Sequence, residues 1–128
     1  MLRRSEIKRI FVVDDEEIIG FTLSLILQRK GFDATPFTSP IDALGVACLD
    51  PPDLLITDIV MPTLTGIELA HEVKQRCPNC KILLFSGGAG ARGLVEAALL
   101  DGNHFHVLHK PVHPIDLLHK IQEMEQAD

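Results

Sequence analysis

The stretch Ile10-Phe11-Val12-Val13-Asp14-Asp15 sets four consecutive apolar residues directly before two carboxylates. A continuous apolar run of this length is typical of a strand that is buried on both faces of a parallel sheet. Four further stretches have the same character, the last two more weakly: Leu54–Thr57, Ile82–Phe85, Phe32–Phe37 and Phe105–Leu108. The sequence therefore predicts five short strands.

Longer amphipathic stretches separate these strands and predict helices over residues 16–30, 40–49, 65–77, 91–101 and 114–126. Ser39 before Pro40 offers an N-cap hydroxyl and a proline at the first helical position, and Thr65-Gly66-Ile67-Glu68 matches a capping box. Strand and helix thus alternate five times, which predicts an α/β fold with helices on both faces of a parallel sheet. We expect one domain over residues 1–128, with no output domain.

The composition is that of a folded domain with an acidic surplus. Of the 128 residues 46% are apolar, and 12 Lys and Arg against 18 Asp and Glu leave a net charge of −6. A nucleic-acid partner is not expected, because binding to phosphates needs a basic patch. The longest mostly apolar stretch, Ile18–Leu27, is too short to span a membrane. Three cysteines are too few for a disulfide framework, so we expect a cytoplasmic protein.

Polar residues gather where the predicted strands end. These residues are Asp14 and Asp15 after the first strand, Asp58 after the third, Ser86 after the fourth and Lys110 after the fifth. Open parallel sheets bind ligands outside the carboxyl ends of their strands, so we expect these side chains at one edge. Clustered carboxylates suit Mg²⁺, and a carboxylate is also a nucleophile toward phosphorus. Phosphoryl transfer requires little beyond positioning and charge neutralisation, so the set predicts that reaction.

Four motifs stand in order at these strand ends: Val12-Val13-Asp14-Asp15-Glu16, Asp58-Ile59-Val60-Met61-Pro62 with Gly66, Leu84-Phe85-Ser86-Gly87, and Lys110-Pro111. The intervals are 44 residues from Asp14 to Asp58, 28 from Asp58 to Ser86 and 24 from Ser86 to Lys110. In motifs and spacing the chain resembles, over essentially its whole length, the receiver domains of two-component response regulators. The resemblance implies a flavodoxin-like (βα)5 fold with strand order 2-1-3-4-5.

The resemblance also implies a role for individual residues. Asp58 would accept a phosphoryl group from a histidine kinase or a histidine phosphotransfer protein. Mg²⁺ would be the cofactor, held by Asp15, Asp58 and the backbone carbonyl of Val60 directly and by Asp14 through water. Ser86 would hydrogen-bond one phosphoryl oxygen and Lys110 would pair with another. The Lys110-Pro111 bond would be cis.

The implied activity is that of a phosphorylation-dependent switch and not of a metabolic enzyme. Such a domain catalyses its own phosphorylation and dephosphorylation. Its downstream partner would be a protein that binds the face formed by the predicted elements 91–101, 105–108 and 114–126. We expect a monomer or a weak homodimer.

Two features depart from the family pattern. Receiver domains usually carry Tyr or Phe three residues before the lysine, where this chain has Val107. The segment 102–110 is also one residue longer than usual, so Phe105 is a candidate to fill the aromatic position through a bulge. We expect the usual hydroxyl-aromatic coupling to be weakened or rebuilt. Val60 and Gly88 stand at positions that tune phosphate loss, and neither side chain can hydrogen-bond an attacking water.

Three other motifs allow different interpretations. Gly88–Gly93 spells G-x-G-x-x-G after a strand, so the alternative function is a small flavodoxin-like nucleotide-binding or redox protein. A ribose site would also need an acid about 20 residues further on, where the chain has His109 and Lys110. Cys77-Pro78-Asn79-Cys80 has redox spacing but closes a helix, which favours helix-end packing. His104 and His106 would recruit a transition metal only with further ligands, so surface histidines are the simpler interpretation.

Each site motif taken singly also has a local explanation. The helix dipole favours acids such as Asp14-Asp15 at a helix start, and Ser86-Gly87 or Lys110-Pro111 can be turns. A domain that uses the fold only as a docking surface is a third possibility. The local explanations account for each piece but not for their common edge, so we favour the phosphoacceptor interpretation.

Overall fold

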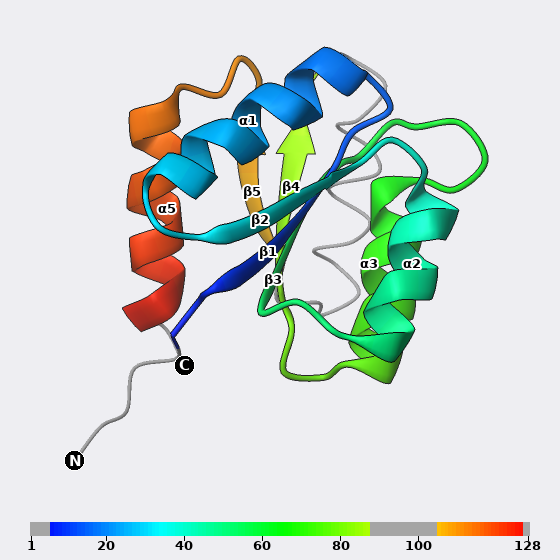
Figure 1. Ribbon diagram of the computed structural model, residues 1–128. Helices are drawn as coiled ribbons and strands as arrows, with labels where there is room; N and C mark the ends of the chain where they lie inside the picture. The colour runs from blue at the N-terminus through cyan, green and yellow to red at the C-terminus, as the bar shows by residue number, and fades with distance from the viewer. Residues whose placement is uncertain (1–5, 88–104, 127–128) are drawn as a thin grey trace.

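Five parallel strands form one sheet at the centre of the protein (Figure 1). The computed structural model describes residues 6–87 and 105–126. The strands are β1 (Arg9–Val13), β2 (Asp33–Phe37), β3 (Leu54–Asp58), β4 (Lys81–Ser86) and β5 (His106–His109). Their order across the sheet is β2-β1-β3-β4-β5, which confirms the predicted flavodoxin-like arrangement.

Helices cover both faces of this sheet. The described helices are α1 (Glu17–Arg29), α2 (Pro40–Leu49), α3 (Gly66–Arg76) and α5 (Pro114–Gln126). Each agrees with its predicted range to within one residue at either end, and the predicted helix over 91–101 lies outside the described residues. Helices α1 and α5 lie on one face, and α2 and α3 lie on the other (Figure 1).

Local hydrogen bonds explain where two of the helices begin. The Ser39 hydroxyl accepts from the Asp42 N–H at 3.2 Å, with Pro40 at the first helical position. Thr65 Oγ1 accepts from the Glu68 N–H at 3.1 Å while Glu68 Oε1 accepts from the Thr65 N–H at 3.0 Å, which confirms the capping box. The box starts α3 a short loop after Asp58.

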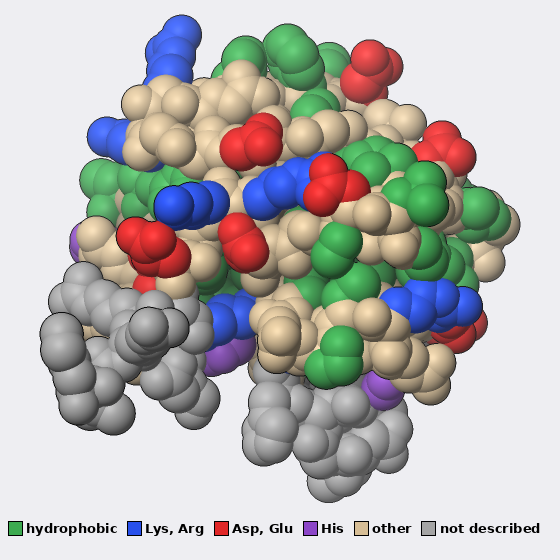
Figure 2. All heavy atoms as spheres, turned by 60° about the horizontal axis from the view of Figure 1, so that its bottom comes forward, with side chains coloured by type: hydrophobic (Ala, Val, Ile, Leu, Met, Phe, Trp, Pro, Cys, Tyr) green, Lys and Arg blue, Asp and Glu red, His purple; other side chains and the backbone are tan. Residues whose placement is uncertain are grey.

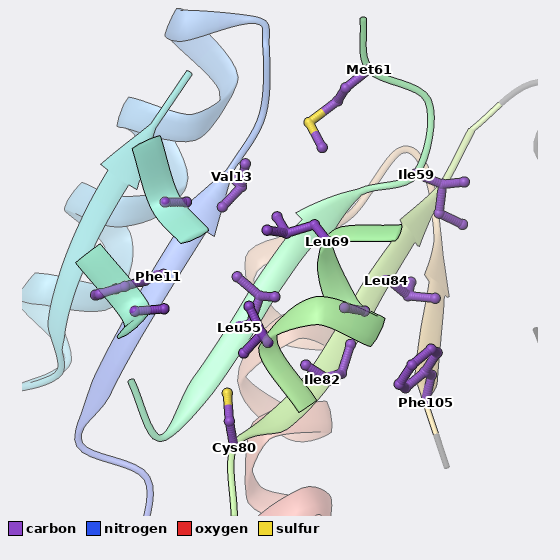
Figure 3. Packing of buried hydrophobic residues seen from close by; sticks show 14 residues of the cluster. Phe11, Val13, Leu55, Ile59, Met61, Leu69, Cys80, Ile82, Leu84 and Phe105 are labelled. Atoms are coloured by element: carbon purple, nitrogen blue, oxygen red, sulfur yellow. The ribbon is translucent and has the colours of Figure 1, made fainter. Parts of the chain in front are cut away.

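The sheet buries apolar side chains in two clusters, one on each face. On the α2 and α3 face, residues from the strands pack against Leu69 and its neighbours on α3 (Figure 3). On the α1 and α5 face, Ile10 and Leu83 pack with Leu27 and Leu117. Because both faces are covered, the central strands are almost inaccessible to solvent, as their continuous apolar runs predict.

Charges of both signs are spread over the surface. On the side drawn in Figure 2, Lys and Arg side chains of the described residues are interspersed with Asp and Glu and form no continuous basic patch. None of the helices within residues 6–87 and 105–126 is long and apolar enough to cross a membrane. Among the described residues, most exposed large apolar side chains belong to two helices: Ile18, Phe21 and Leu25 of α1, and Ile41, Val46 and Leu49 of α2.

The carboxyl ends of the strands meet at one edge of the sheet. Strand β3 extends through Asp58 and β4 through Ser86, one residue further than the sequence predicts, because Asp58 aligns with Phe85 and Ser86 with His109. The Lys110 N–H donates to the Ser86 carbonyl at 2.7 Å and joins the end of β5 to that of β4. The predicted site residues therefore share one rigid edge.

Candidate functional site

Three carboxylates converge at this edge. Oxygens of Asp14, Asp15 and Asp58 lie within 4.8 Å of one another. Asp14 is 2% exposed and Asp58 8%, whereas Asp15 is open to solvent. In the described part of the chain no other group of three or more His, Cys, Asp or Glu side chains comes together in this way. The structure thus brings together the acids that the sequence analysis singled out.

Backbone hydrogen bonds hold the two buried carboxylates. Asp14 Oδ1 accepts from the Glu16 N–H at 2.9 Å, and Asp58 Oδ1 accepts from the Ile59 N–H at 2.9 Å. Asp14 Oδ2 is buried and has no hydrogen-bond partner. Burial raises the pKa of Asp14, and the charges of Asp58 and Asp15 act in the same direction. The Asp14 carboxylate is therefore held in place at an electrostatic cost.

Lys110 supplies a positive charge to the cluster. Its Nζ lies 3.1 Å from Asp58 Oδ2 and 3.6 Å from Asp14 Oδ2. The second distance is that of an ion pair and is too long for a good hydrogen bond. Burial by itself lowers the pKa of Lys110, but the hydrogen bond to Asp58 and the charges of Asp14 and Asp58 outweigh it and raise that pKa. Lys110 is consequently a stable ammonium that faces both buried carboxylates.

This donor set fits a hard divalent cation. All three clustered side chains offer carboxylate oxygens, the ligand type that Mg²⁺ prefers. One ammonium does not neutralise three carboxylates, and the buried Asp14 Oδ2 has no hydrogen-bond partner to replace the water it loses on burial. The cluster is therefore able to hold a metal ion. The Val60 carbonyl belongs to the loop directly after Asp58, and its part as a ligand stays a prediction.

Two residues fix the backbone around Asp58. The Thr57 hydroxyl donates to the Asp58 carbonyl at 2.9 Å. Gly66 packs so closely against the same carbonyl that a Cβ at position 66 would lie 1.9 Å from its oxygen. Gly66 belongs to a motif recognised in the sequence, whereas the role of Thr57 was not predicted. The available signal was a single hydroxyl residue that ends the apolar run Leu54–Thr57, a run predicted to be buried on both faces.

Gly87 makes room for the lysine. A Cβ at position 87 would lie 2.8 Å from Lys110 Cδ and 3.2 Å from Lys110 Cβ. The stem of Lys110 therefore passes directly over Gly87 on its way to Asp58. Ser86, one residue earlier, ends β4 at 8% exposure, and its hydrogen bond to a phosphoryl oxygen stays a prediction. Gly87 belongs to the Leu84–Gly87 motif, but its packing against Lys110 was not predicted.

Two smaller expectations are also answered. The Lys110-Pro111 peptide bond is cis, as the resemblance implies. Asp14 has a local role at the start of α1, where its Oδ1 accepts from the Glu16 N–H, but it belongs to the acidic cluster as well. The purely local explanation of these acids is therefore insufficient.

Phe105 does not fill the missing aromatic position. Strands β4 and β5 pair in regular register from Leu83 with His106 to Ser86 with His109, without a bulge. Ser86 is paired with His109, and Phe105 lies four residues before His109 in the chain. Figure 3 shows the Phe105 ring near Ile82. The centroids of the Phe105 and His71 rings are 5.5 Å apart. Val107 pairs with Leu84 and packs into the core. The prediction that a bulge carries Phe105 into that space is wrong, because no extra residue follows it in the strand.

The remaining motifs add no second site among the described residues. Residues 88–93, which carry the G-x-G-x-x-G motif, lie outside the described residues, as does His104. Cys77 is the C-cap residue of α3, and the Cys80 N–H donates to the Cys77 carbonyl at 3.0 Å. The C-x-x-C spacing therefore closes a helix, as predicted.

Comparisons with known proteins agree with this geometry. Residues 10–122 match the family model of the response regulator receiver domain. The response regulator receiver protein CpdR of Brucella abortus (strain 2308) is 35% identical over 118 residues, which are 91% of this chain and 96% of CpdR. The alkaline phosphatase synthesis transcriptional regulatory protein PhoP of Bacillus subtilis (strain 168) is 39% identical over 79 residues, 62% of this chain but 33% of PhoP. A solved response regulator receiver domain protein from Clostridium thermocellum has a TM-score of 0.81 at 26% identity and covers 91% of this chain and 93% of its own.

Proposed function

This chain belongs to the response regulator receiver domain family, and from that premise we propose that Asp58 accepts a phosphoryl group from a phosphohistidine donor in a Mg²⁺-dependent reaction. One observation carries the proposal. Asp58 Oδ2 lies 3.1 Å from the Lys110 ammonium, within an acidic cluster whose Asp14 Oδ2 lacks a hydrogen-bond partner. This combination favours a cation and a transferring phosphoryl group, each of which relieves the repulsion among the carboxylates.

The reaction replaces a phosphorus–nitrogen bond with a phosphorus–oxygen bond. A carboxylate oxygen of Asp58 attacks phosphorus, and the donor imidazole leaves with the electron pair and takes a proton. Lys110 pairs with one phosphoryl oxygen and Ser86 hydrogen-bonds another. Mg²⁺ held directly by Asp15, Asp58 and the Val60 carbonyl, and by Asp14 through water, would neutralise developing charge. Attack of water on the same phosphorus restores Asp58, so the domain catalyses both its phosphorylation and its dephosphorylation.

A small phosphodonor tests this chemistry without a partner protein. The purified chain is incubated with acetyl phosphate and Mg²⁺ and followed by intact mass spectrometry. We expect the mass of one phosphoryl group to be added, and Asp58→Asn and chelation of Mg²⁺ to abolish the addition. Asp116→Asn, which removes an exposed carboxylate of α5, serves as the matched control and keeps it. Phosphorylation that persists in Asp58→Asn would refute the assignment.

The donor protein is proposed to dock on α1. This helix begins directly after the acidic cluster, and Ile18 and Phe21, 80% and 55% exposed, lie three residues apart on one side of it. A cavity of about 560 Å³ lies beside them, lined by Ile19 and Val112 and by the stem of Lys110. Apolar surface next to the phosphoacceptor supports docking of a helical donor that presents its histidine to Asp58.

Two phosphodonors separate docking from chemistry. In Phe21→Glu we expect the rate of phosphotransfer from a phosphohistidine protein to fall relative to the rate with acetyl phosphate. Leu49→Glu on α2, where the leucine is 88% exposed, should leave this ratio at the wild-type value. If Phe21→Glu and Leu49→Glu gave the same ratio of the two phosphorylation rates, the donor protein would dock on another surface.

Signal output is proposed to use the surface of β5 and α5 together with residues 91–101, which lie outside the described residues. The Lys110 N–H to Ser86 carbonyl bond supports this route, because it joins the site to the end of β5. Capture of partners by the phosphorylated chain, with Asp58→Ala as the control, tests it. We expect a monomer or weak homodimer, and the free cysteines are consistent with the reducing cytoplasm.

A further inference from the structure

Three cysteines gather where α2 and α3 end. Cys48 lies in the last turn of α2 and is exposed, Cys77 caps α3 and is half-buried, and Cys80 is buried just before β4. The two helices lie side by side with these ends together (Figure 1). The fold therefore allows Cys48 to pair with Cys77, which the C-x-x-C motif does not indicate.

Cys80 is poorly suited to react. It is 2% exposed and packs in the core of the α2 and α3 face, where Figure 3 shows its sulfur directed toward Leu55. Burial raises the pKa of Cys80 to about 12. Since the thiolate is the reactive form, Cys80 is inert at neutral pH. The nearest neighbour of Cys77 in the sequence is thus the wrong partner for it.

Cys77 instead contacts α2. Its thiol donates to the Ala47 carbonyl at 3.6 Å. That carbonyl belongs to the last turn of α2, where backbone oxygens have no donor within the helix. A carbonyl oxygen lies about 2.8 Å from the Cα of the next residue in a planar peptide, so the Cys77 sulfur is within about 6.5 Å of the Cys48 Cα.

Cys48 faces the same junction. It directly follows Ala47, the residue of α2 whose carbonyl accepts from the Cys77 thiol. Burial raises the pKa of Cys77, and the neighbouring Cys48 raises it further. An oxidant reaches Cys48 from solvent, because that residue is exposed.

We propose that Cys48 and Cys77 form a reversible disulfide bond when the protein meets a peroxide, so that α2 and α3 are joined at their C-terminal ends. The Cys48 sulfur lies about 2.8 Å from its Cα, so a rotamer directed at Cys77 would bring the two sulfurs within about 4 Å. Helix ends fray, so the last step to a sulfur–sulfur bond of about 2.05 Å needs little movement.

The chemistry balances with one peroxide per bond. The Cys48 thiolate attacks a peroxide oxygen, the oxygen–oxygen bond breaks, and hydroxide leaves to give a sulfenic acid. The Cys77 sulfur then attacks the Cys48 sulfur, and the hydroxyl group leaves as water with the proton of the second thiol. Two thiols lose two electrons and one hydrogen peroxide becomes two waters. A small dithiol reverses the reaction.

This bond is independent of phosphotransfer. Helix α3 has 11 residues, so about 16 Å separate its capped C-terminal end from Gly66 beside Asp58. Oxidation is therefore measured on the unphosphorylated chain, and failure of one proposal leaves the other standing.

Peptide mapping tests the pairing. The folded, reduced chain is treated with hydrogen peroxide, its remaining thiols are alkylated, and it is digested with trypsin without reductant. Cleavage after Lys30, Lys74, Arg76 and Lys81 places Cys48 in peptide 31–74 and both other cysteines in peptide 77–81. We expect a cross-link between these peptides within monomeric protein, lost on reduction and absent from Cys48→Ser and Cys77→Ser. Because it does not use Cys80, the cross-link must survive in Cys80→Ser.

Every other outcome overturns the proposal. A disulfide within peptide 77–81 would assign the oxidation to the C-x-x-C motif. A dimer linked through two copies of Cys48 would make it an intermolecular event, and three free thiols after peroxide would show that the pair does not close. Circular dichroism of the reduced variants verifies that each is folded, and the exposed Cys48→Ser variant keeps the test valid if a substitution at a more buried cysteine unfolds the chain.

Discussion

Gly66→Ala should damage the fold at its functional edge. The added Cβ would lie 1.9 Å from the Asp58 carbonyl oxygen and 2.8 Å from its carbon. Real Cβ atoms essentially never approach closer than 3.0 Å, so α3 or the end of β3 must move by at least 1.1 Å, the difference between 3.0 and 1.9 Å. Both contacts are backbone atoms, and the Asp58 carbonyl is also bound by Thr57, so no side chain can swing away to absorb the clash.

The expected cost has two parts. Overpacking of this kind costs about 1 to 3 kcal/mol, and the displacement strains the Gly66 N–H to Ile59 carbonyl bond of 2.8 Å, worth about 1 kcal/mol. We therefore expect Gly66→Ala to lower the free energy of unfolding by about 3 kcal/mol. For a domain of this size that corresponds to a fall in Tm of roughly 10 °C.

Gly45→Ala is the matched control. Gly45 lies inside α2, and a Cβ there would have no atom within 4 Å outside its own helix and chain neighbours. Alanine is a better helix former than glycine by about 1 kcal/mol, so Gly45→Ala should raise stability by about that amount. Urea denaturation followed by circular dichroism, with thermal melts in parallel, measures both variants. A Gly66→Ala protein as stable as wild type would refute the steric argument, since the same substitution then costs nothing at the crowded position.

Three further variants test other parts of the structure. Ser24→Ala should raise the free energy of unfolding by about 1 kcal/mol in urea denaturation, because the Ser24 hydroxyl is buried in α1 without a hydrogen-bond partner; a loss of stability would mean that this hydroxyl is satisfied. Thr63→Gly should stabilise the chain by about 1 kcal/mol in the same assay, because Thr63 has a φ of +76°, which a β-branched residue adopts at a cost; an unchanged denaturation midpoint would speak against strain in this loop. His106→Gln should change how stability depends on pH, since burial, aided by Lys120 and Lys81 and opposed by Glu123, lowers the pKa of His106 below its ordinary value of 6.5. As pH falls below 6.5, His106 binds a proton more readily in the unfolded chain than in the native chain, so the free energy of unfolding of the wild type decreases. The variant has no imidazole at this position and does not show this decrease. In thermal melts between about pH 7.5 and 5.5, the Tm of the variant should rise relative to the Tm of the wild type as the pH is lowered. A constant difference in Tm over this range would contradict the prediction.

The sequence by itself determined the elements and the composition of the site. The apolar run Ile10–Val13 is continuous because its strand is covered on both faces, and the bonds of Ser39 and Thr65 to nearby backbone start their helices at the predicted places. Once strands and helices alternate, the residues at the strand ends must share one edge of the sheet. That rule predicts that Asp58, Lys110 and their neighbours cluster, and it needs no measured distance.

Tertiary structure alone decided how those elements touch. In the folded chain Asp14 is buried while the adjacent Asp15 is exposed, and the Lys110 stem packs over Gly87. Phe105 lies four residues before His109, the residue that pairs with Ser86. Tertiary structure also directs the Cys77 thiol toward the Ala47 carbonyl of α2, a contact that the C-x-x-C spacing does not indicate. The physical reason is that sequence spacing determines the periodicity within one helix or strand, whereas the register and packing between elements tens of residues apart depend on all the side chains that fill the space between them.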